Sequence, residues 1–333
     1  MTQTRCLITA YFLQAGDEAD RRLRDAGIAT EFQPRRAARD EDELIRIAQG
    51  VDAVIASIDP FSARVLAALP RLRIISRTGV GYDAIDVAAA TARGVAVCTG
   101  PGVNRHAVAE YAIALMLQCA RHVSEHVASV RAGGWDRYEG FDLAGKTVGI
   151  VGLGTIGKEV AQRLRAFEMR ILAYDPVPDP QFAEGHGVTY VNLEQLLQES
   201  DLITLHALLD AQSRKLLNAE RLALLKPTAY VINTARGGLI DHDALYAALR
   251  GHKIAGAALD AFEQEPLEDT PLRTLDNCWL SPHAAGASRD ARARSKHVAV
   301  ENVLRFFRGE RPLHIVNPEV LAKGDLHGPF PMR

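Results

Sequence analysis

The sequence contains few cysteines and almost no net charge, and both shortages exclude classes of protein. Its four cysteines lie far apart without Cys-x-x-Cys spacing, so we expect reduced, mostly buried thiols rather than a disulfide framework or a cysteine metal site. The formal net charge is −2, which gives no reason to expect a nucleic-acid or membrane partner. We predict no bound metal and no nucleic acid.

Long hydrophobic runs are also missing. The most apolar stretch, AIALMLQCA at residues 112–120, is shorter than a bilayer requires and is better explained as a buried helix. The first residues, MTQTRCLITAYF, lack the basic start and long apolar core of a secretory signal. Together with the reduced thiols, these features predict a cytoplasmic protein.

The chain does contain two series of alternating strand and helix patterns. Short runs rich in Val, Ile and Leu, such as CLITA and LRIIS, alternate with helix-like segments over the first hundred residues. A second series begins at KTVGIVGLG and continues to CWLSPH. Such alternation predicts parallel sheets covered by helices, and a length of 333 residues favours two domains.

These two series predict an α/β fold made of two doubly wound parallel-sheet domains. We expect one discontinuous domain, residues 1–100 and 288–317, and one inserted domain, residues 101–287. The helical pattern after His283 is expected to leave the second series and to pack against the first. Residues 318–333 contain Pro and Gly and are expected to form an extended tail.

A glycine-rich turn, GLGTIG, separates the strand pattern KTVGIV from a helix pattern. Gly152 would permit the tight turn, Gly154 would let a pyrophosphate approach the backbone, and Gly157 would permit close helix–strand packing. Asp175 ends the next strand, near the distance of about 20 residues at which dinucleotide-binding folds place a carboxylate. It would bind the ribose hydroxyls and repel a 2′-phosphate, so we expect NAD rather than NADP. The alternative is a glycine turn that binds no ligand.

Charged side chains follow three later strands, where parallel strands bring their carboxyl ends to one crevice. Arg236 follows the first of them, Asp260 and Glu265 the second, and His283 the third. Each of them alone also fits a surface arginine, a helix-capping aspartate, a solvated glutamate or a loop histidine. His283 stands between Pro282 and a run of small residues, which would hold it stiffly and leave room for a substrate.

In this order the motifs resemble the D-isomer-specific 2-hydroxyacid dehydrogenases. The resemblance runs from about residue 50 to residue 317 and rests on RTGVGYDAID, VAEYAIALML, GLGTIG, INTARGGLID, ALDAFEQEP and SPHAAGAS. It implies a flavodoxin-like substrate domain split in sequence and an inserted Rossmann domain that binds NAD. It also implies a homodimer built on the long apolar helix pattern at residues 104–130, although that pattern also fits a purely intrachain role.

The resemblance further implies roles for single residues. Arg236 would orient the substrate carboxylate and carbonyl, His283 would move the proton, and Glu265 would support His283. Asp260 would hold the nicotinamide amide. Contacts to the cofactor are implied at Gly152, Gly154, Thr155, Ile156, Gly157, Asp175, His206, Thr234, Ala235, Asp260, His283 and Gly286. Contacts to the substrate are implied at Arg77, Val80, Gly81, Asn104 and Arg236.

The residue types also fit this chemistry by themselves. Oxidation of a 2-hydroxy acid needs a base for the hydroxyl proton, and histidine, with an ordinary pKa near 6.5, can serve both directions near neutrality. A carboxylate at Glu265 would favour the imidazolium form of His283. Arg236 would supply a fixed fork for a carboxylate and positive potential near the carbonyl oxygen.

The sequence departs from the family at Leu208 and Asp210, where relatives carry proline and threonine, so we expect a differently shaped loop there. Val80 stands where phosphite dehydrogenases carry lysine, and Glu265 where formate dehydrogenases carry glutamine, which argues against both substrates. Few residues follow IVNPEV, so we expect none of the regulatory domain that some phosphoglycerate dehydrogenases append.

The sequence leaves the identity of the substrate open. Arg77, Arg105 and His106 lie near the expected mouth, where they would meet a phosphate or a second carboxylate, or Arg77 and Arg105 form structural ion pairs. The candidates are therefore 3-phosphoglycerate and the small acids glyoxylate, hydroxypyruvate or another 2-keto acid. The remaining alternative is an NAD-sensing scaffold like the corepressors related to these enzymes.

Overall fold

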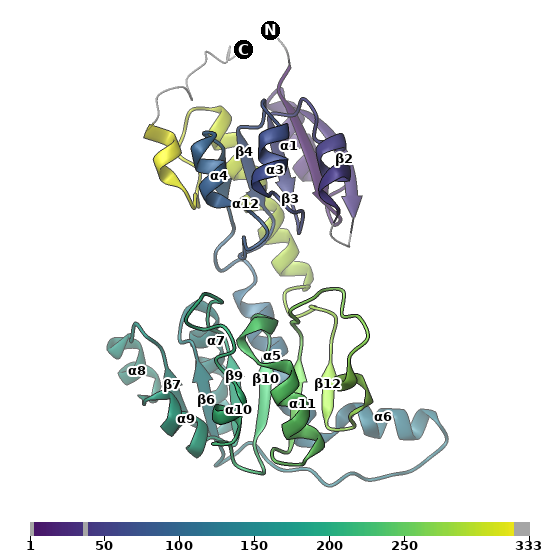
Figure 1. The fold of residues 1–333 in the computed structure, drawn as a ribbon, viewed down its shortest axis with the longest axis vertical. Helices are drawn as coiled ribbons and strands as arrows, with labels where there is room; N and C mark the ends of the chain where they lie inside the picture. Colours follow the sequence, from purple (N-terminus) through teal and green to yellow (C-terminus); the bar gives the residue numbers. More distant parts are fainter. Residues whose placement is uncertain (1–2, 36–38, 323–333) are drawn as a thin grey trace. The chain divides into compact units, whose positions relative to one another are not determined.

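The computed structural model describes residues 3–35 and 39–322, which form two compact units (Figure 1). The split unit comprises residues 1–104 and 288–333, and the inserted unit comprises residues 105–287. The first boundary falls after Asn104 rather than after residue 100, because Arg105 begins the first helix of the inserted unit.

The inserted unit contains a sheet of seven parallel strands. In chain order they are β6 (Thr147–Val151), β7 (Arg170–Tyr174), β8 (Val188–Tyr190), β9 (Leu202–Leu205), β10 (Tyr230–Asn233), β11 (Gly256–Leu259) and β12 (Cys278–Leu280). Their order across the sheet is β12-β11-β10-β9-β6-β7-β8, which changes direction between β6 and β9. This is the strand order of dinucleotide-binding folds, extended by one strand, and ligands bind at that change of direction.

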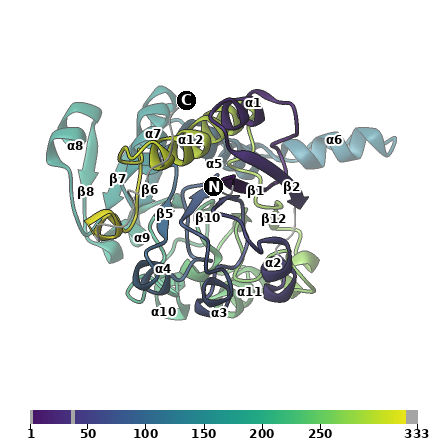
Figure 2. The ribbon, with the colours of Figure 1, turned by 90° about the horizontal axis from the view of Figure 1, so that it is seen from above.

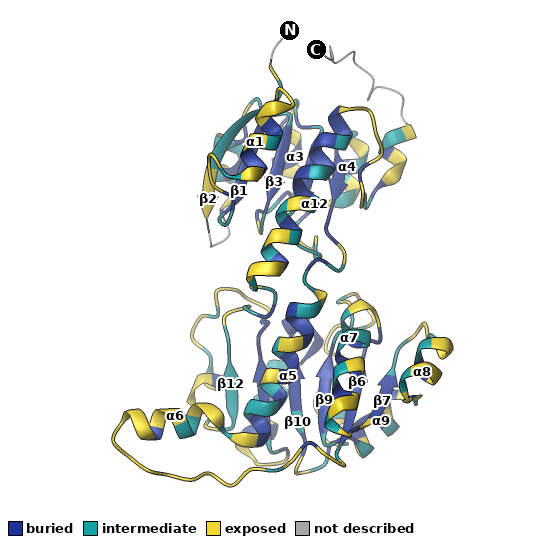
Figure 3. Cartoon of the chain, turned by 180° about the vertical axis from the view of Figure 1, so that it is seen from behind, coloured by how far each residue is buried: buried dark blue, intermediate teal, exposed yellow. Residues whose placement is uncertain are grey.

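Helices cover both faces of this sheet. On one face lie α5 (Arg105–Arg121), α7 (Thr155–Leu164) and α8 (Pro180–His186), whose apolar side chains share a core with the strands. On the other lie α9 (Leu193–Glu199), α10 (Ala219–Leu222) and α11 (His242–Arg250). Short 3-10 helices occur at Arg165–Phe167, Gly237–Leu239 and Pro271–Thr274. Figure 3 shows the resulting buried layer of strands.

The helix pattern at residues 104–130 forms two helices instead of one. The chain breaks at His122, whose φ of 48° places it in the left-handed region, and α6 (Val123–Arg131) follows. The apolar side chains of α5 are largely buried in the core of the inserted unit, whereas α6 is mostly exposed (Figure 3). The two helices therefore differ in what they can offer to another molecule.

The split unit contains five parallel strands, β1 (Arg5–Ala10), β2 (Ala29–Arg35), β3 (Ala53–Ala56), β4 (Ile74–Arg77) and β5 (Ala96–Cys98). Their order, β2-β1-β3-β4-β5, is that of flavodoxin-like folds. One face is covered by α1 (Glu18–Asp25) and α12 (Arg289–Phe307), and the other by α2 (Glu41–Ile47), α3 (Ala63–Ala68) and α4 (Val87–Ala92) (Figure 2). The predicted fold class is confirmed in both units.

The last described residues cover the open edge of this sheet at β5. Val316 N–H donates to the carbonyl of Val97 at 2.8 Å, and the side-chain oxygen of Asn317 accepts from the N–H of Val97 at 2.8 Å. The amide nitrogen of Asn317, which is 1% exposed, donates to the carbonyl of Val95 and to the hydroxyl of Thr91. One side chain thus supplies partners that a neighbouring strand would otherwise provide.

The prediction of an extended tail is wrong for its first residues. Pro318–Ala322 forms a 3-10 helix, because Val320 is buried at 2% exposure in the apolar core of the split unit. The rest of the predicted tail, residues 323–333, lies outside the described residues. Across the described ranges no helix is both long and apolar enough to cross a membrane.

All four cysteines are free thiols, and three of them are buried. Burial raises the pKa of Cys6 and of Cys98 to about 12, so both remain protonated near neutrality. No group of His, Cys, Asp and Glu in the described part of the chain could hold a metal ion.

Replacing Asn317 with alanine is expected to destabilise the split unit. The change leaves the N–H of Val97 without its acceptor, and a buried polar group without a partner costs about 1–3 kcal/mol. We expect the free energy of unfolding to fall by about 2 kcal/mol, measured by urea denaturation. The exposed neighbour change Arg311→Ala is the control and should have little effect. Equal midpoints for both variants would contradict this role.

Candidate functional site

The candidate site lies where the strands of the inserted unit end level with one another. The last residues of β6 and β9, Val151 and Leu205, are register partners, as are Leu205 and Asn233 at the end of β10. The same holds between Asn233 and Leu259 and between Leu259 and Leu280. Val151 also pairs with Tyr174 at the end of β7. Each predicted cofactor or catalytic residue of this unit lies in the segment after one of these strand ends or in the first turn of the helix that follows.

The glycine turn has the geometry that a pyrophosphate needs. Gly152 has a φ of 93°, and a Cβ atom there would lie 2.6 Å from the backbone nitrogen of Ala207. A Cβ atom on Gly157 would lie 2.1 Å from the carbonyl oxygen of Gly152, so helix and turn touch through backbone alone. Gly154 caps α7 without a side-chain hydrogen bond and has open space where its Cβ would be. The first turn of α7, which begins at Thr155, therefore has the open space in which its backbone N–H groups can bind an anion.

Asp175 is fixed beside this turn by two backbone bonds. One carboxylate oxygen accepts from Leu153 N–H at 2.8 Å and the other from Val177 N–H at 2.8 Å. Each oxygen keeps a further lone pair for a ribose hydroxyl. Ile156, which follows Thr155 in α7, is partly buried against the apolar core of this face, so its side chain faces that core.

Two polar atoms near the change of strand direction are buried without a hydrogen-bond partner among the described residues. They are Nδ1 of His206 and the hydroxyl oxygen of Thr234. The other ring nitrogen of His206 lies 2.9 Å from the hydroxyl of Thr204, and burial lowers the pKa of His206 to about 4, so the ring is neutral. Such orphaned groups fit a site that a bound molecule completes. Together with the glycine turn and Asp175, they fit a dinucleotide.

A histidine–carboxylate pair stands at the other end of this edge. Nδ1 of His283 lies 2.7 Å from Oε2 of Glu265, and the two side chains are 48% and 34% exposed. The other oxygen of Glu265 accepts from Phe262 N–H at 2.9 Å. Both carboxylate oxygens are therefore held, and Nε2 of His283 is the ring nitrogen directed away from this pair.

Pairing changes the pKa of both His283 and Glu265. The hydrogen bond to Glu265 raises the pKa of His283, against an opposing effect of burial. Burial by itself would raise the pKa of Glu265, but the hydrogen bond and charge of His283 leave it below its ordinary value. The positive charge of Arg236 lowers the pKa of both groups to a smaller extent.

Asp260 holds the loop that carries His283. Its carboxylate, 1% exposed, accepts from the Ser281 hydroxyl at 2.6 Å and from the N–H groups of Ala284 and Ala285 at 2.8 Å each. His283 itself has a φ of 51°, a left-handed conformation that this loop must impose. Sequence reasoning missed this role because the partners of Asp260 are mainly backbone amides. Its predicted contact with nicotinamide stays a prediction, as does the contact of Gly286 in the same loop.

Arg236 follows β10 and is fixed by a residue that sequence reasoning missed. Asn233, fully buried at the end of β10, donates to the carbonyl of Arg236 at 2.9 Å and accepts from Ala235 N–H at 3.0 Å. The guanidinium of Arg236 donates to the carbonyl of Ala235 at 2.8 Å. The strand end Tyr-Val-Ile-Asn was the available signal, because a buried asparagine there needs partners beyond the sheet.

The loop of Leu208 and Asp210 forms a self-contained turn. Asp210 accepts from the N–H groups of Gln212 and Ser213 at 2.8 Å each, and the hydroxyl of Ser213 donates to the carbonyl of Leu208. Leu208 is 84% exposed. The turn is thus closed by its own polar groups, and its shape relative to the family stays a prediction.

The predicted substrate contacts of the split unit follow β4. Thr78 N–H donates to the carbonyl of Ala56, and the hydroxyl of Ser295 on α12 donates to the carbonyl of Thr78. These bonds hold the start of the loop that contains Val80 and Gly81. Arg77 ends β4 with Nη2 3.5 Å from where a Cβ of Gly79 would lie. Asn104 has a buried side-chain oxygen without a partner in the described part of the chain.

Arg105 and His106 belong to the inserted unit and share one carboxylate. Nε of Arg105 lies 3.0 Å from one oxygen of Glu159, and Nδ1 of His106 lies 3.1 Å from the other. Glu159 also pairs with Arg163 at 2.6 Å. Arg105 therefore has a structural ion-pair partner on α7, which is the role that the sequence left open for it.

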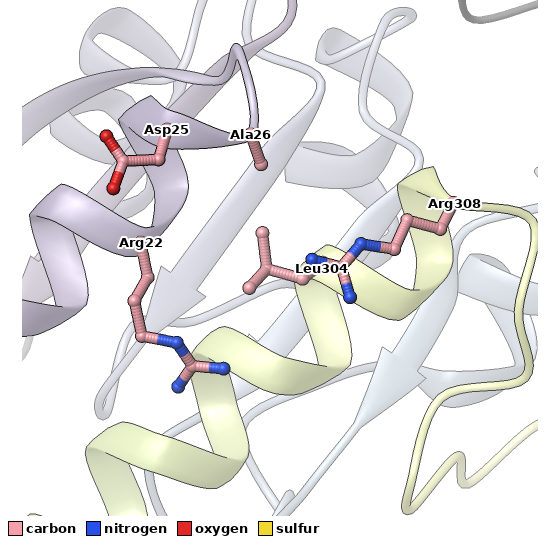
Figure 4. A pocket seen from close by; sticks show the side chains of 5 residues that line it. All are labelled: Arg22, Asp25, Ala26, Leu304 and Arg308. Carbon is pink, nitrogen blue, oxygen red and sulfur yellow. The ribbon is translucent and has the colours of Figure 1, made fainter. Parts of the chain in front are cut away.

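Each unit has a surface hollow among its described residues. A hollow of about 240 Å³ in the split unit is lined by Arg22, Asp25, Ala26, Leu304 and Arg308 (Figure 4). Both α1 and α12 end there, and Arg22, one of the two arginines that line it, is paired with Glu301 at 2.6 Å. A hollow of about 360 Å³ in the inserted unit adjoins Thr155 and Lys158 and belongs to the dinucleotide end of the site.

Comparison with known proteins identifies the family. The model of the D-isomer specific 2-hydroxyacid dehydrogenase NAD binding domain matches residues 113–285. The chain is 44% identical to a glyoxylate reductase of Korarchaeum cryptofilum over 84% of this chain and 86% of the relative. It is 40% identical to a D-3-phosphoglycerate dehydrogenase of Methanocaldococcus jannaschii over 83% of this chain but only 54% of the relative. It thus spans about half of that dehydrogenase.

Solved structures agree with these relatives. The TT0316 protein of Thermus thermophilus has a TM-score of 0.86 and 38% identity, covering 94% of this chain and all of its own. A glyoxylate reductase from Paecilomyes thermophila has a TM-score of 0.84 and 30% identity, covering 96% of this chain and all of its own. The predicted family, enzyme class and cofactor are confirmed: the chain belongs to the D-isomer-specific 2-hydroxyacid dehydrogenases, oxidoreductases that use NAD(H).

Proposed function

We propose that this enzyme reduces a small 2-keto acid, of the glyoxylate and hydroxypyruvate kind, to the 2-hydroxy acid. The observation that carries the proposal is the 2.7 Å pair of His283 and Glu265 at the same sheet edge as the glycine turn. A histidine bound to a carboxylate can deliver and recover one proton near neutrality, which is what a carbonyl–alcohol interconversion requires.

The residues divide the work as follows. The glycine turn and Asp175 would hold NADH, which would supply a hydride for the carbonyl carbon. His283, protonated at both nitrogens, donates the proton on Nε2 to the developing alkoxide while Nδ1–H stays bonded to Glu265. Arg236 binds the substrate carboxylate and stabilises negative charge on the carbonyl oxygen. In the reverse direction neutral His283 takes the hydroxyl proton.

The proposed size of the substrate depends on the side chains beside the start of α7. A phosphorylated acid would need further positive charge, yet Arg105 and His106 are both engaged by Glu159. The glyoxylate reductase of Korarchaeum cryptofilum is matched over 86% of its own length, and the phosphoglycerate dehydrogenase of Methanocaldococcus jannaschii over only 54%. Both points favour a small, unphosphorylated acid, and 3-phosphoglycerate is the second candidate. The contacts proposed for Arg77, Val80, Gly81 and Asn104 follow from the sequence resemblance.

The enzyme is also proposed to be a homodimer that pairs through α6 and the segment after it. This surface exposes Val123, Val127, Val130, Trp135 and Tyr138, each at least 44% accessible. The three valines follow helical spacing along α6, so they form one apolar stripe. Apolar patches of this kind mark protein interfaces. We propose the cytoplasm as its compartment, because the four cysteines are free.

The substrate and the role of His283 are tested together. We expect NADH oxidation with glyoxylate or hydroxypyruvate, and a fall in kcat of about 10²- to 10⁴-fold in His283→Ala with NADH binding retained. Exposed His252 provides the control variant, His252→Ala, which should keep full activity. Turnover with phosphohydroxypyruvate alone would replace the small acid by the phosphorylated one. NADH binding without turnover on any keto acid would favour the scaffold alternative.

The pH profile tests Glu265. Because Glu265 raises the pKa of His283, it keeps the imidazolium present to higher pH. Glu265→Gln removes that charge, so the alkaline limb of kcat/KM for keto-acid reduction should move to lower pH. In Glu263→Gln, an exposed neighbour paired with Arg214, the limb should stay in place. An unmoved limb in Glu265→Gln would show that the pair does not set the protonation of His283.

The oligomeric state tests α6. Val127→Asp puts a charge into the apolar stripe, and we expect the variant to sediment as a monomer while the unchanged protein sediments as a dimer. Leu313→Asp, an exposed apolar position of the split unit, is the control and should leave the dimer intact. A dimer in both variants would place the interface elsewhere.

A further inference from the structure

The carboxylate of Glu265 makes two hydrogen bonds, and only one of them is to His283. One oxygen faces His283, and the other accepts from Phe262 N–H at 2.9 Å. A glutamate side chain has several rotatable bonds, so the amide of Phe262 fixes the rotation of the carboxylate. The position of the Phe262 backbone therefore decides whether Oε2 meets the imidazole.

Phe262 is confined from two directions. On its backbone side stands Gly237, the residue after Arg236: a Cβ atom there would lie 2.1 Å from the carbonyl carbon of Phe262 and 2.3 Å from the nitrogen of Glu263. On its side-chain side stands the ring of His242, with ring centroids 6.3 Å apart and an edge-on angle of 65°. Phe262 is 8% exposed and joins the apolar core of this face.

A histidine is an unusual residue to pack against Phe262, because its ring nitrogens need hydrogen-bond partners. It is the first residue of α11, and its Nε2 is buried without a hydrogen-bond partner among the described residues. The charged groups that act on its ring are Glu263, Asp241, Asp243 and Lys215; burial outweighs them and lowers the pKa of His242, so the ring is neutral near pH 7. A carbon ring of the same shape would avoid the unpaired nitrogen. What His242 contributes is therefore the flat ring against Phe262.

We propose that His242 is a positioning residue, whose ring seats Phe262 so that its amide holds Glu265 against His283. The inference rests on the proposed role of the His283–Glu265 pair. It assigns His242 no contact with substrate or cofactor. Loss of the ring lets Phe262 move into the vacated space, the amide leaves Oε1, and the carboxylate is free to rotate away from the imidazole.

The test compares His242→Ala with His242→Phe. In His242→Ala we expect the alkaline limb of kcat/KM for keto-acid reduction to move to lower pH, in the direction of Glu265→Gln, with kcat lowered about tenfold and NADH affinity unchanged. His242→Phe keeps the ring and removes the unpaired nitrogen. The His242→Phe variant should have the same alkaline limb of kcat/KM as the unchanged enzyme, and it should melt at a higher temperature.

The matched control is Asp243→Ala, which removes a charge that acts on His242 but leaves the ring. Its limb should stay in place, because His283 is influenced by Glu265, Asp260 and Arg236 rather than by Asp243. If His242→Ala does not fold, His242→Leu also lacks the flat ring, and the same shift is expected in it.

The outcomes separate the inference from the function on which it rests. An unmoved limb in His242→Ala, with the limb moved in Glu265→Gln, overturns the positioning role and leaves the pair intact. A shift in His242→Phe as large as that in His242→Ala also overturns it, because the ring shape would then not matter. Full activity of His283→Ala would instead overturn the proposed function.

Discussion

The site depends on one constraint, the parallel register that ends the strands of the inserted unit at one level. Val151, Leu205 and Asn233 pair across three neighbouring strands, so the residues that follow them emerge side by side. The change of strand direction between β6 and β9 then separates the loops that would otherwise crowd each other. A slip of one residue in any strand would turn its last side chain to the opposite face and carry the following loop with it.

Along this edge, backbone groups do most of the positioning. Asp260 gathers amides of the His283 loop, Asn233 holds the carbonyl of Arg236, and Phe262 holds Glu265. Each reacting side chain is therefore fixed through a neighbouring main chain that is itself packed or hydrogen-bonded. This explains why small residues surround the site: Gly152 and Gly237 stand where any Cβ would separate two loops that must touch.

The sequence predicts the parts of this arrangement that are local. The glycine turn and Asp175 follow from spacing, because strand, turn and helix are consecutive. The pairing of Glu265 with His283 was expected from the motifs, although neither composition nor periodicity could place them at hydrogen-bond distance. The hydrogen bonds by which Asp260 holds the His283 loop could not be predicted, because they run to backbone amides, whose positions the residue types do not specify. The break at His122 was missed because the helix pattern continues through it, and only the backbone angle reveals it.

The cover that Asn317 and its neighbours place on β5 has a consequence for how the protein is made. The ribosome completes every strand of the split unit before it begins the inserted unit, yet α12 and the segment around Asn317 emerge only after the inserted unit. During synthesis the early sheet must wait with an open edge, and with one face covered only by α1, while the inserted unit forms its own core. The nascent chain thus carries an unfinished split unit while the whole inserted unit is translated, which is a period of exposure to aggregation and to chaperones.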